Sequence, residues 1–218
     1  MSPQTVFAVV DDLGALLLFT MILILAAGQI YRAIYAVAAQ SLLIAAAAAV
    51  LAAGTGNGDL WVIAGLTLTV KAIVLPLVLH RVVQRMNVKR EIDPVISVAL
   101  TLAIALLVVV LAFHLSASLG PVRQAITGNA LPVGIALTLL GVLVMATSTT
   151  ALHQMVGLFA SENGIFFTAM AVSGGMPLII EIGVILDVIL AALVMAIMVL
   201  RVRSTVDADI ATLDRLRG

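Results

Sequence analysis

Long apolar segments separated by short polar breaks run through almost the whole chain. A hydrocarbon core of about 30 Å takes about 20 apolar residues to cross as an α-helix. Seven segments are long enough, and they predict transmembrane helices at 6–28, 33–53, 60–80, 94–114, 131–150, 154–173 and 177–200. The predicted fold class is therefore all-α, a polytopic membrane protein with seven transmembrane helices. We expect a single transmembrane domain over 1–200 and a C-terminal tail over 201–218.

The breaks contain residues that end helices or begin turns. A glycine-rich run occupies 54–58, and a charged run occupies 81–93. Three prolines fall in the first turn of a predicted helix, where the missing N–H costs nothing: Pro94, Pro132 and Pro177. Pro76 differs, because it lies inside the third predicted helix, five residues after Lys71. We expect it to kink that helix or to free a backbone carbonyl near the lysine.

Composition agrees with a membrane protein and excludes several kinds of site. Hydrophobic residues make up 63% of the chain and charged residues only 10%, which is outside the range of soluble globular proteins. Cysteine is absent, so this chain forms no disulfide and ligates no iron–sulfur cluster. The histidines, His80, His114 and His153, have no metal-ligand spacing, and we interpret them as interfacial polar residues. We expect no catalytic centre, cofactor, metal site or nucleic-acid interface in this chain.

The basic residues indicate an orientation, because cytoplasmic loops carry the excess of lysine and arginine. Arg123 alone falls on one side of the predicted membrane. The other side has nine basic residues: Arg32, Arg81, Arg85, Lys89, Arg90, Arg201, Arg203, Arg215 and Arg217. We therefore predict an outside N-terminus and a cytoplasmic C-terminal tail. The N-terminus lacks the basic region of a cleavable signal peptide, so we expect the first apolar segment to be retained as a span.

An internal similarity suggests how the fold is built. The segment 60–81 overlays without gaps on 178–199 and pairs Thr69 with Asp187. If the similarity reflects a duplication, helices 1–3 and 5–7 form two parallel three-helix units joined by helix 4. Spans rich in alanine, leucine and valine also resemble one another by composition alone, so both interpretations stay open.

Three charged residues lie near the middle of predicted helices: Lys71, Glu162 and Asp187. A charge at a helix centre costs about 2.5 to 3.5 kcal/mol on insertion scales, so a functional role is the first hypothesis. All three share a depth near the midplane, where groups on different helices can form a lateral proton relay. A structural ion pair within the bundle is the alternative. Glu181, six residues before Asp187, could extend the relay toward the outer face or be an ordinary interfacial acid.

Four further polar residues could support this relay: Asn163, Gln40, Ser41 and His153. Asn163 follows Glu162 directly, and Gln40 and Ser41 lie inside the second predicted helix. Hydrogen bonding between helices is the simplest role for that pair, and contact with a relay water is the alternative.

Five segments together resemble a known family, the E-type membrane component of the hydrogenase 4 and formate hydrogenlyase complexes: 39–41, 69–76, 157–164, 177–187 and 214–218. The region 131–200 is also similar to the three-helix K-type subunit of respiratory complex I. Glu162 matches the glutamate in the second helix of that subunit. Asp187 matches the glutamate of the third helix only approximately in position, and it is a shorter acid.

The resemblance implies a non-redox membrane-arm subunit that carries part of a proton or Na⁺ translocation path. Its implied partners are antiporter-like and complex I-like membrane subunits and a hydrogenase or related redox module, in the plasma membrane of a prokaryote. A subunit of a multisubunit cation/proton antiporter without a redox module is the main alternative. A stand-alone seven-helix permease or receptor would need a central polar cavity, for which the chain offers few polar residues. A purely structural scaffold would tolerate neutral replacements of all three midspan charges.

Overall fold

The computed structural model describes residues 2–85, 95–118 and 129–173. Its elements there are the helices α1 (Pro3–Leu25), α2 (Ile30–Thr55), α3 (Gly58–Leu66), η1 (Thr67–Val74), α4 (Leu75–Arg85), α5 (Val98–Ala117), α7 (Ala130–Thr147) and α8 (Ala151–Ser173). Because α3, η1 and α4 follow one another without a break, these elements make six helices. Five of the six are long and apolar enough to cross a membrane. The chain is thus an all-α, multi-pass membrane protein, and the predicted helix at 177–200 lies outside the described residues.

Helix ends follow local capping chemistry, and this moves some boundaries from their predicted places. The Ser97 side chain accepts the Leu100 N–H, so α5 begins at Val98, four residues after the predicted start at 94. Asn57 caps α3 through the Asp59 N–H. Gly56, at the C-terminus of α2, has φ +70°, a left-handed conformation that glycine adopts without strain.

The third helix is irregular where Pro76 was expected to disturb it. The segment Thr67–Val74 is π-helical, and at its end the Leu75 N–H bonds to the Val70 carbonyl, five residues back. A proline has no N–H to continue the α-helical ladder, so the turn before it is free to widen. Lys71 lies inside this π-helical segment and is buried. The irregular part of the helix therefore includes the lysine.

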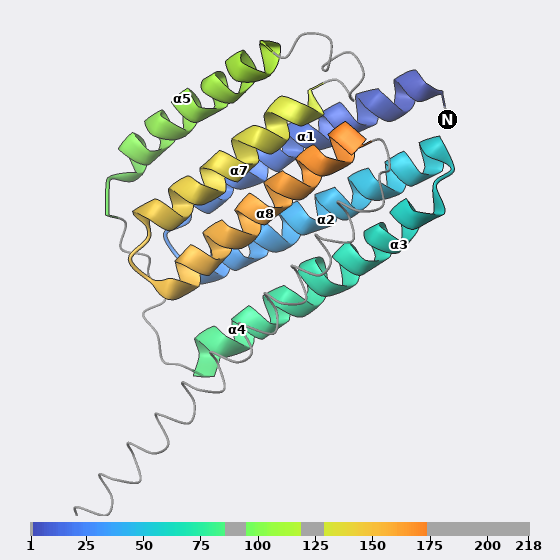
Figure 1. The fold of residues 1–218 in the computed structure, drawn as a ribbon. Helices are drawn as coiled ribbons and strands as arrows, with labels where there is room; N and C mark the ends of the chain where they lie inside the picture. Colours follow the sequence, from blue (N-terminus) through green and yellow to red (C-terminus); the bar gives the residue numbers. More distant parts are fainter. Residues whose placement is uncertain (1, 86–94, 119–128, 174–218) are drawn as a thin grey trace, which may run out of the picture.

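The described helices run side by side along their lengths (Figure 1), and the connections from α1 to α2, from α2 to α3 and from α7 to α8 are short. α2 packs against α1, α8 and the continuous α3–η1–α4 helix. α5 packs on α7 and keeps most of its large apolar side chains exposed, among them Leu106 and Leu107. In a bilayer these side chains meet lipid or a neighbouring protein, since neither contact carries the cost of apolar surface in water.

The tightest helix pair is α7 with α8, and glycines explain the close approach. Gly134 and Gly141 on α7 face Gly157 and Gly164 on α8. A methyl group added at any of the four would lie less than 3.0 Å from an atom of the other helix. Small residues let membrane helices approach backbone to backbone, where van der Waals packing and hydrogen bonds hold them. This pair fixes the position of α8 and its polar residues.

Candidate functional site

An ion pair between Lys71 and Glu162 lies buried among the helices. The Lys71 Nζ is 3.3 Å from the Glu162 Oε1, and the two side chains are only 5% and 8% exposed. Neither carboxylate oxygen has a hydrogen-bond partner among the described residues. The lysine thus supplies the charge that balances this carboxylate within the described bundle. Removing an ion pair from water costs free energy, and the attraction of the two charges repays that cost only when further hydrogen bonds are made. The acid of this pair has none among the described residues.

Asn163 connects this pair to the second helix. The Lys71 Nζ donates to the Asn163 Oδ1 at 3.4 Å. The amide nitrogen of Asn163 in turn lies 3.1 Å from the Gln40 Oε1 and 3.2 Å from the Ser41 Oγ. The result is a continuous polar network of five side chains from η1, α8 and α2, in which Asn163 is the bridge.

The network forms because each helix presents its polar residues toward the others. Buried residues of α2 recur at helical spacing, and Gln40 and Ser41 lie within that stripe. Glu162 is eleven residues from either end of α8, and Lys71 is near the middle of the continuous helix from Gly58 to Arg85. The two charges therefore meet at the depth that the sequence predicted for them, near the midplane of the helices.

Two contacts of this network were missed by the sequence analysis. The Phe166 ring lies 5.8 Å from the Lys71 Nζ, within the range of a cation–π contact. Phe166 is four residues after Glu162, so the same face of α8 carries the carboxylate and the ring, and helical spacing could have indicated it. The Met21 sulfur on α1 lies 3.8 Å from the Gln40 Nε2. No residue pattern in the sequence pointed to Met21.

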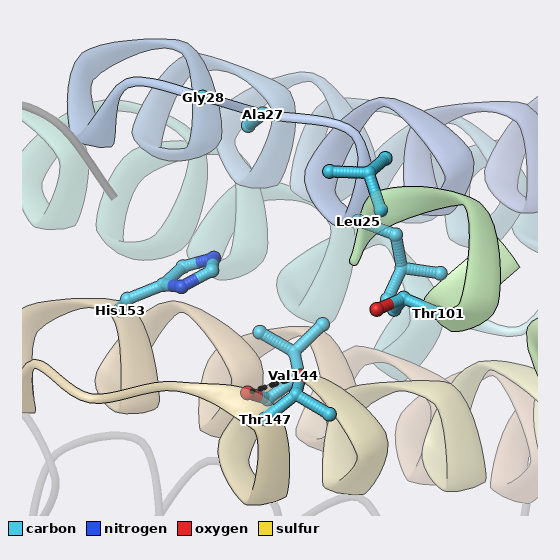
Figure 2. A pocket seen from close by; sticks show the side chains of 8 residues that line it. Leu25, Ala27, Gly28, Thr101, Val144, Thr147 and His153 are labelled. Carbon is cyan, nitrogen blue, oxygen red and sulfur yellow. Dashed lines mark hydrogen bonds between the residues drawn. The ribbon is translucent and has the colours of Figure 1, made fainter. Parts of the chain in front are cut away.

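Of the remaining predicted site residues the structure describes only His153, which is not part of this network. His153 lies nine residues before Glu162 on α8, in the first turn of the helix. Its Nδ1 is 2.9 Å from the Ser148 Oγ, and its ring borders a cavity of about 70 Å³ between the ends of α1 and α7 and the start of α5 (Figure 2). Asp187 and Glu181 lie outside the described residues.

The network has the chemistry of a charge-compensated site within the membrane and shows no metal-binding arrangement. No cluster of three or more metal-ligating side chains occurs within 2–85, 95–118 and 129–173. What the five side chains offer is a carboxylate, an ammonium group and neutral hydrogen-bonding groups in contact with one another. Such a set can hold a proton or redistribute charge when a neighbouring charge changes.

Comparison with known proteins relates the chain to one curated protein over most of its length. No family model matches it, and no solved structure matches it. The uncharacterized protein Rv0085 of Mycobacterium tuberculosis is 32% identical to it over 152 residues, which cover 69% of this chain and 69% of the relative. Since this similarity extends over more than two thirds of both proteins, the chain belongs to the same family as Rv0085.

Proposed function

We propose that this protein is a non-redox membrane-arm subunit of a complex I-like energy-converting hydrogenase, of the hydrogenase 4 or formate hydrogenlyase type. In this role the Lys71–Glu162 pair is one link of a proton or Na⁺ translocation path. Asp187 and Glu181 continue the path on the seventh helix. The partners are antiporter-like membrane subunits and a hydrogenase or related redox module.

The buried ion pair is the observation that carries the proposal. A charge pair near the midplane costs free energy. Replacing such a pair with apolar residues of similar volume often leaves the stability of a protein unchanged or increases it. Its presence is therefore better explained by ion transfer than by stability. The carboxylate oxygens without a hydrogen-bond partner among the described residues support this role, because they are acceptors available to a proton.

The architecture that belongs to this proposal has seven helices, with the N-terminus outside and the C-terminal tail in the cytoplasm of a prokaryote. Helices 1–3 and 5–7 then form two parallel three-helix units joined by helix 4. The contact between α2 and α8 supports such a pairing, since these are the second helices of the two units.

A subunit of a multisubunit cation/proton antiporter remains the second candidate, because the same ion pair serves ion transfer without a redox partner. Purification of the tagged chain in mild detergent separates the two candidates. A nickel–iron hydrogenase pair among the copurified proteins supports the first. Antiporter subunits without a hydrogenase favour the second, and a stable single chain with a ligand-dependent melting temperature would favour a permease.

Replacing the carboxylate tests the ion-transfer role directly. Glu162→Gln keeps the side-chain volume and removes the titrating group, so we expect an assembled complex in which ion translocation is lost or uncoupled from turnover. Assembly is measured on native gels, and translocation is measured with a pH-gradient dye in proteoliposomes. Gln84→Glu is a matched control, because it replaces an amide with a carboxylate, the reverse exchange, at an exposed position of α4.

The two readouts distinguish an ion path from a structural pair. Normal assembly with impaired translocation in Glu162→Gln supports the proposal. Normal translocation in that variant would overturn it. Loss of assembly in both Glu162→Gln and Lys71→Met would instead favour a structural ion pair.

A further inference from the structure

His153 has a defined hydrogen-bonding state, which follows from its neighbour Ser148. The Ser148 hydroxyl donates to the Val144 carbonyl, and its oxygen lies 2.9 Å from the His153 Nδ1. A hydroxyl has one hydrogen, so toward the imidazole the Ser148 Oγ can only accept. The proton of the ring is therefore on Nδ1, and the Nε2 presents a lone pair.

The Nε2 lone pair is an acceptor without a donor in the described structure. His153 is 7% exposed, and its Nε2 is buried with no hydrogen-bond partner among the described residues. The ring extends into the cavity that Leu25, Thr101, Val144 and Thr147 also line (Figure 2).

Neither threonine hydroxyl that lines the cavity is free to donate a hydrogen to the His153 Nε2. The Thr101 hydroxyl donates to the Ser97 carbonyl at 3.2 Å. The Thr147 hydroxyl donates to the Leu143 carbonyl at 2.8 Å. Both threonine oxygens keep lone pairs that can accept, but neither can supply a hydrogen to the imidazole.

The cavity has the size and the polar groups that a bound water requires. A water needs roughly 10 to 15 Å³ of cavity and two to four polar partners. The cavity of about 70 Å³ exceeds the first requirement. The imidazole Nε2 and the two threonine oxygens meet the second, because a water can donate one hydrogen to the nitrogen and the other to a hydroxyl oxygen.

We propose that this cavity is a hydrated protonation site in which His153 exchanges protons with bound water. A hydronium ion gives its proton to the Nε2 and leaves a neutral water, while the Nδ1–H remains on the Ser148 oxygen. Among the described residues, α1, α5 and α7 contribute no titratable side chain to the cavity lining. Arg32, in the first turn of α2, is exposed and is not among the lining residues.

The site is separate from the Lys71–Glu162 pair. Nine residues of α8 correspond to about 14 Å of rise, which is far beyond a direct proton transfer. Val156 and Ala160, which follow His153 at helical spacing, are fully buried apolar residues. The proposed hydration stands whether or not the chain serves a hydrogenase complex.

Nuclear magnetic resonance on the full chain in lipid nanodiscs tests the site. The chain has three histidines, so ¹⁵N labelling of histidine gives few signals, and His153→Gln assigns the one of interest. We expect the nitrogen shifts of an Nδ1–H tautomer and magnetisation transfer from water to the His153 ring. Absence of that transfer in the unmodified chain would overturn the proposal, since a dry cavity cannot supply protons.

A pair of variants links the transfer to the cavity. Thr101→Leu extends an apolar side chain into it, and we expect at least a fivefold decrease in water transfer to the ring. Thr69→Leu is the matched control, because the Thr69 hydroxyl also bonds to a carbonyl four residues back, but Thr69 is exposed and is not among the lining residues, so transfer should stay within twofold. Unchanged transfer in Thr101→Leu would mean that the water lies elsewhere, which contradicts the proposal.

Discussion

Lys71 is surrounded by groups of three kinds: the Glu162 carboxylate, the Asn163 amide oxygen and the Phe166 ring. Each compensates part of the desolvation of a buried ammonium group, and together they explain how a lysine is tolerated at this depth. Glu162 has fewer compensating contacts than Lys71. Among the described residues its carboxylate contacts the lysine and has no hydrogen-bond partner. The buried carboxylate therefore depends more on its partner's charge than the lysine does.

A single and a double replacement should show that the two charges compensate each other. Lys71→Met leaves the Glu162 carboxylate buried without its counter-charge, a change that costs about 3 to 5 kcal/mol in buried pairs. The double variant Lys71→Met/Glu162→Gln removes both charges, so we expect it to recover most of that stability. Unfolding in mixed detergent micelles, followed by circular dichroism, gives the two free energies.

The exposed arginine of α2 provides the control for this cycle. Arg32→Met removes a cation from the surface, and we expect an unfolding free energy within about 0.5 kcal/mol of the parent chain. A double variant no more stable than Lys71→Met alone would show that the two charges do not compensate each other.

At the scale of the helices, the α7–α8 pair holds the polar network in position. Its glycines place the two backbones in contact, and Asn163 precedes one of them, Gly164. The network also depends on the π-helical segment before Pro76, which contains Lys71. Packing of one helix pair and irregularity in another thus determine where the charges meet.

A methyl group at the helix contact should be more disruptive than one on an open face. At Gly164 a Cβ would collide with the backbone nitrogen of Thr138, so Gly164→Ala forces the helices apart. We expect a loss of about 1 to 3 kcal/mol, the usual cost of overpacking. Gly65→Ala is the matched control, because nothing lies within 4 Å of a Cβ there.

Stability of the two glycine variants can be compared by thermal unfolding in the same detergent. Gly65→Ala should unfold at or slightly above the temperature of the parent chain, since alanine is the better helix former. Equal melting temperatures for the two variants would mean that α7 and α8 are not in backbone contact.

The whole molecule is a set of apolar helices with much of their apolar surface exposed. Leu106, Leu107 and Val62 are each at least 67% exposed, and large apolar side chains are also exposed on the other long helices. In water such a surface would aggregate, whereas a bilayer or neighbouring subunits accommodate it.

Reporter fusions should reveal a cytoplasmic end and an outside loop. The nine-to-one distribution of basic residues places a reporter after Gly218 in the cytoplasm and one inserted at Gly56 outside. Paired fusions to alkaline phosphatase and green fluorescent protein measure both positions. A reporter inserted at Gly28 is the internal control, because α2 separates it from Gly56 and it should report the opposite side. Reversed signals at all three positions would invert the orientation.

The class of the protein, six helices of the described structure and the depth of Lys71 and Glu162 could all be predicted from the sequence alone. Apolar length is read directly from composition, and depth follows from residue number because a helix rises by a constant step. These are properties of one segment at a time, so Lys71 and Glu162 could be placed near the same level before any contact was known. The disturbance before Pro76 was predictable for the same reason, although not its π-helical form.

The choice of which polar residues meet depends on how the helices pack in three dimensions. Helices that are apolar on every side carry little information about which face packs inward, so the rotation of α8 about its axis could not be predicted. That rotation brings Asn163 to Gln40 and Ser41. His153 instead pairs with Ser148, which follows α7 directly, because the short connection between α7 and α8 sets the two side by side at the end of the bundle. Contacts between helices depend on packing in three dimensions, and spacing along one helix does not contain them.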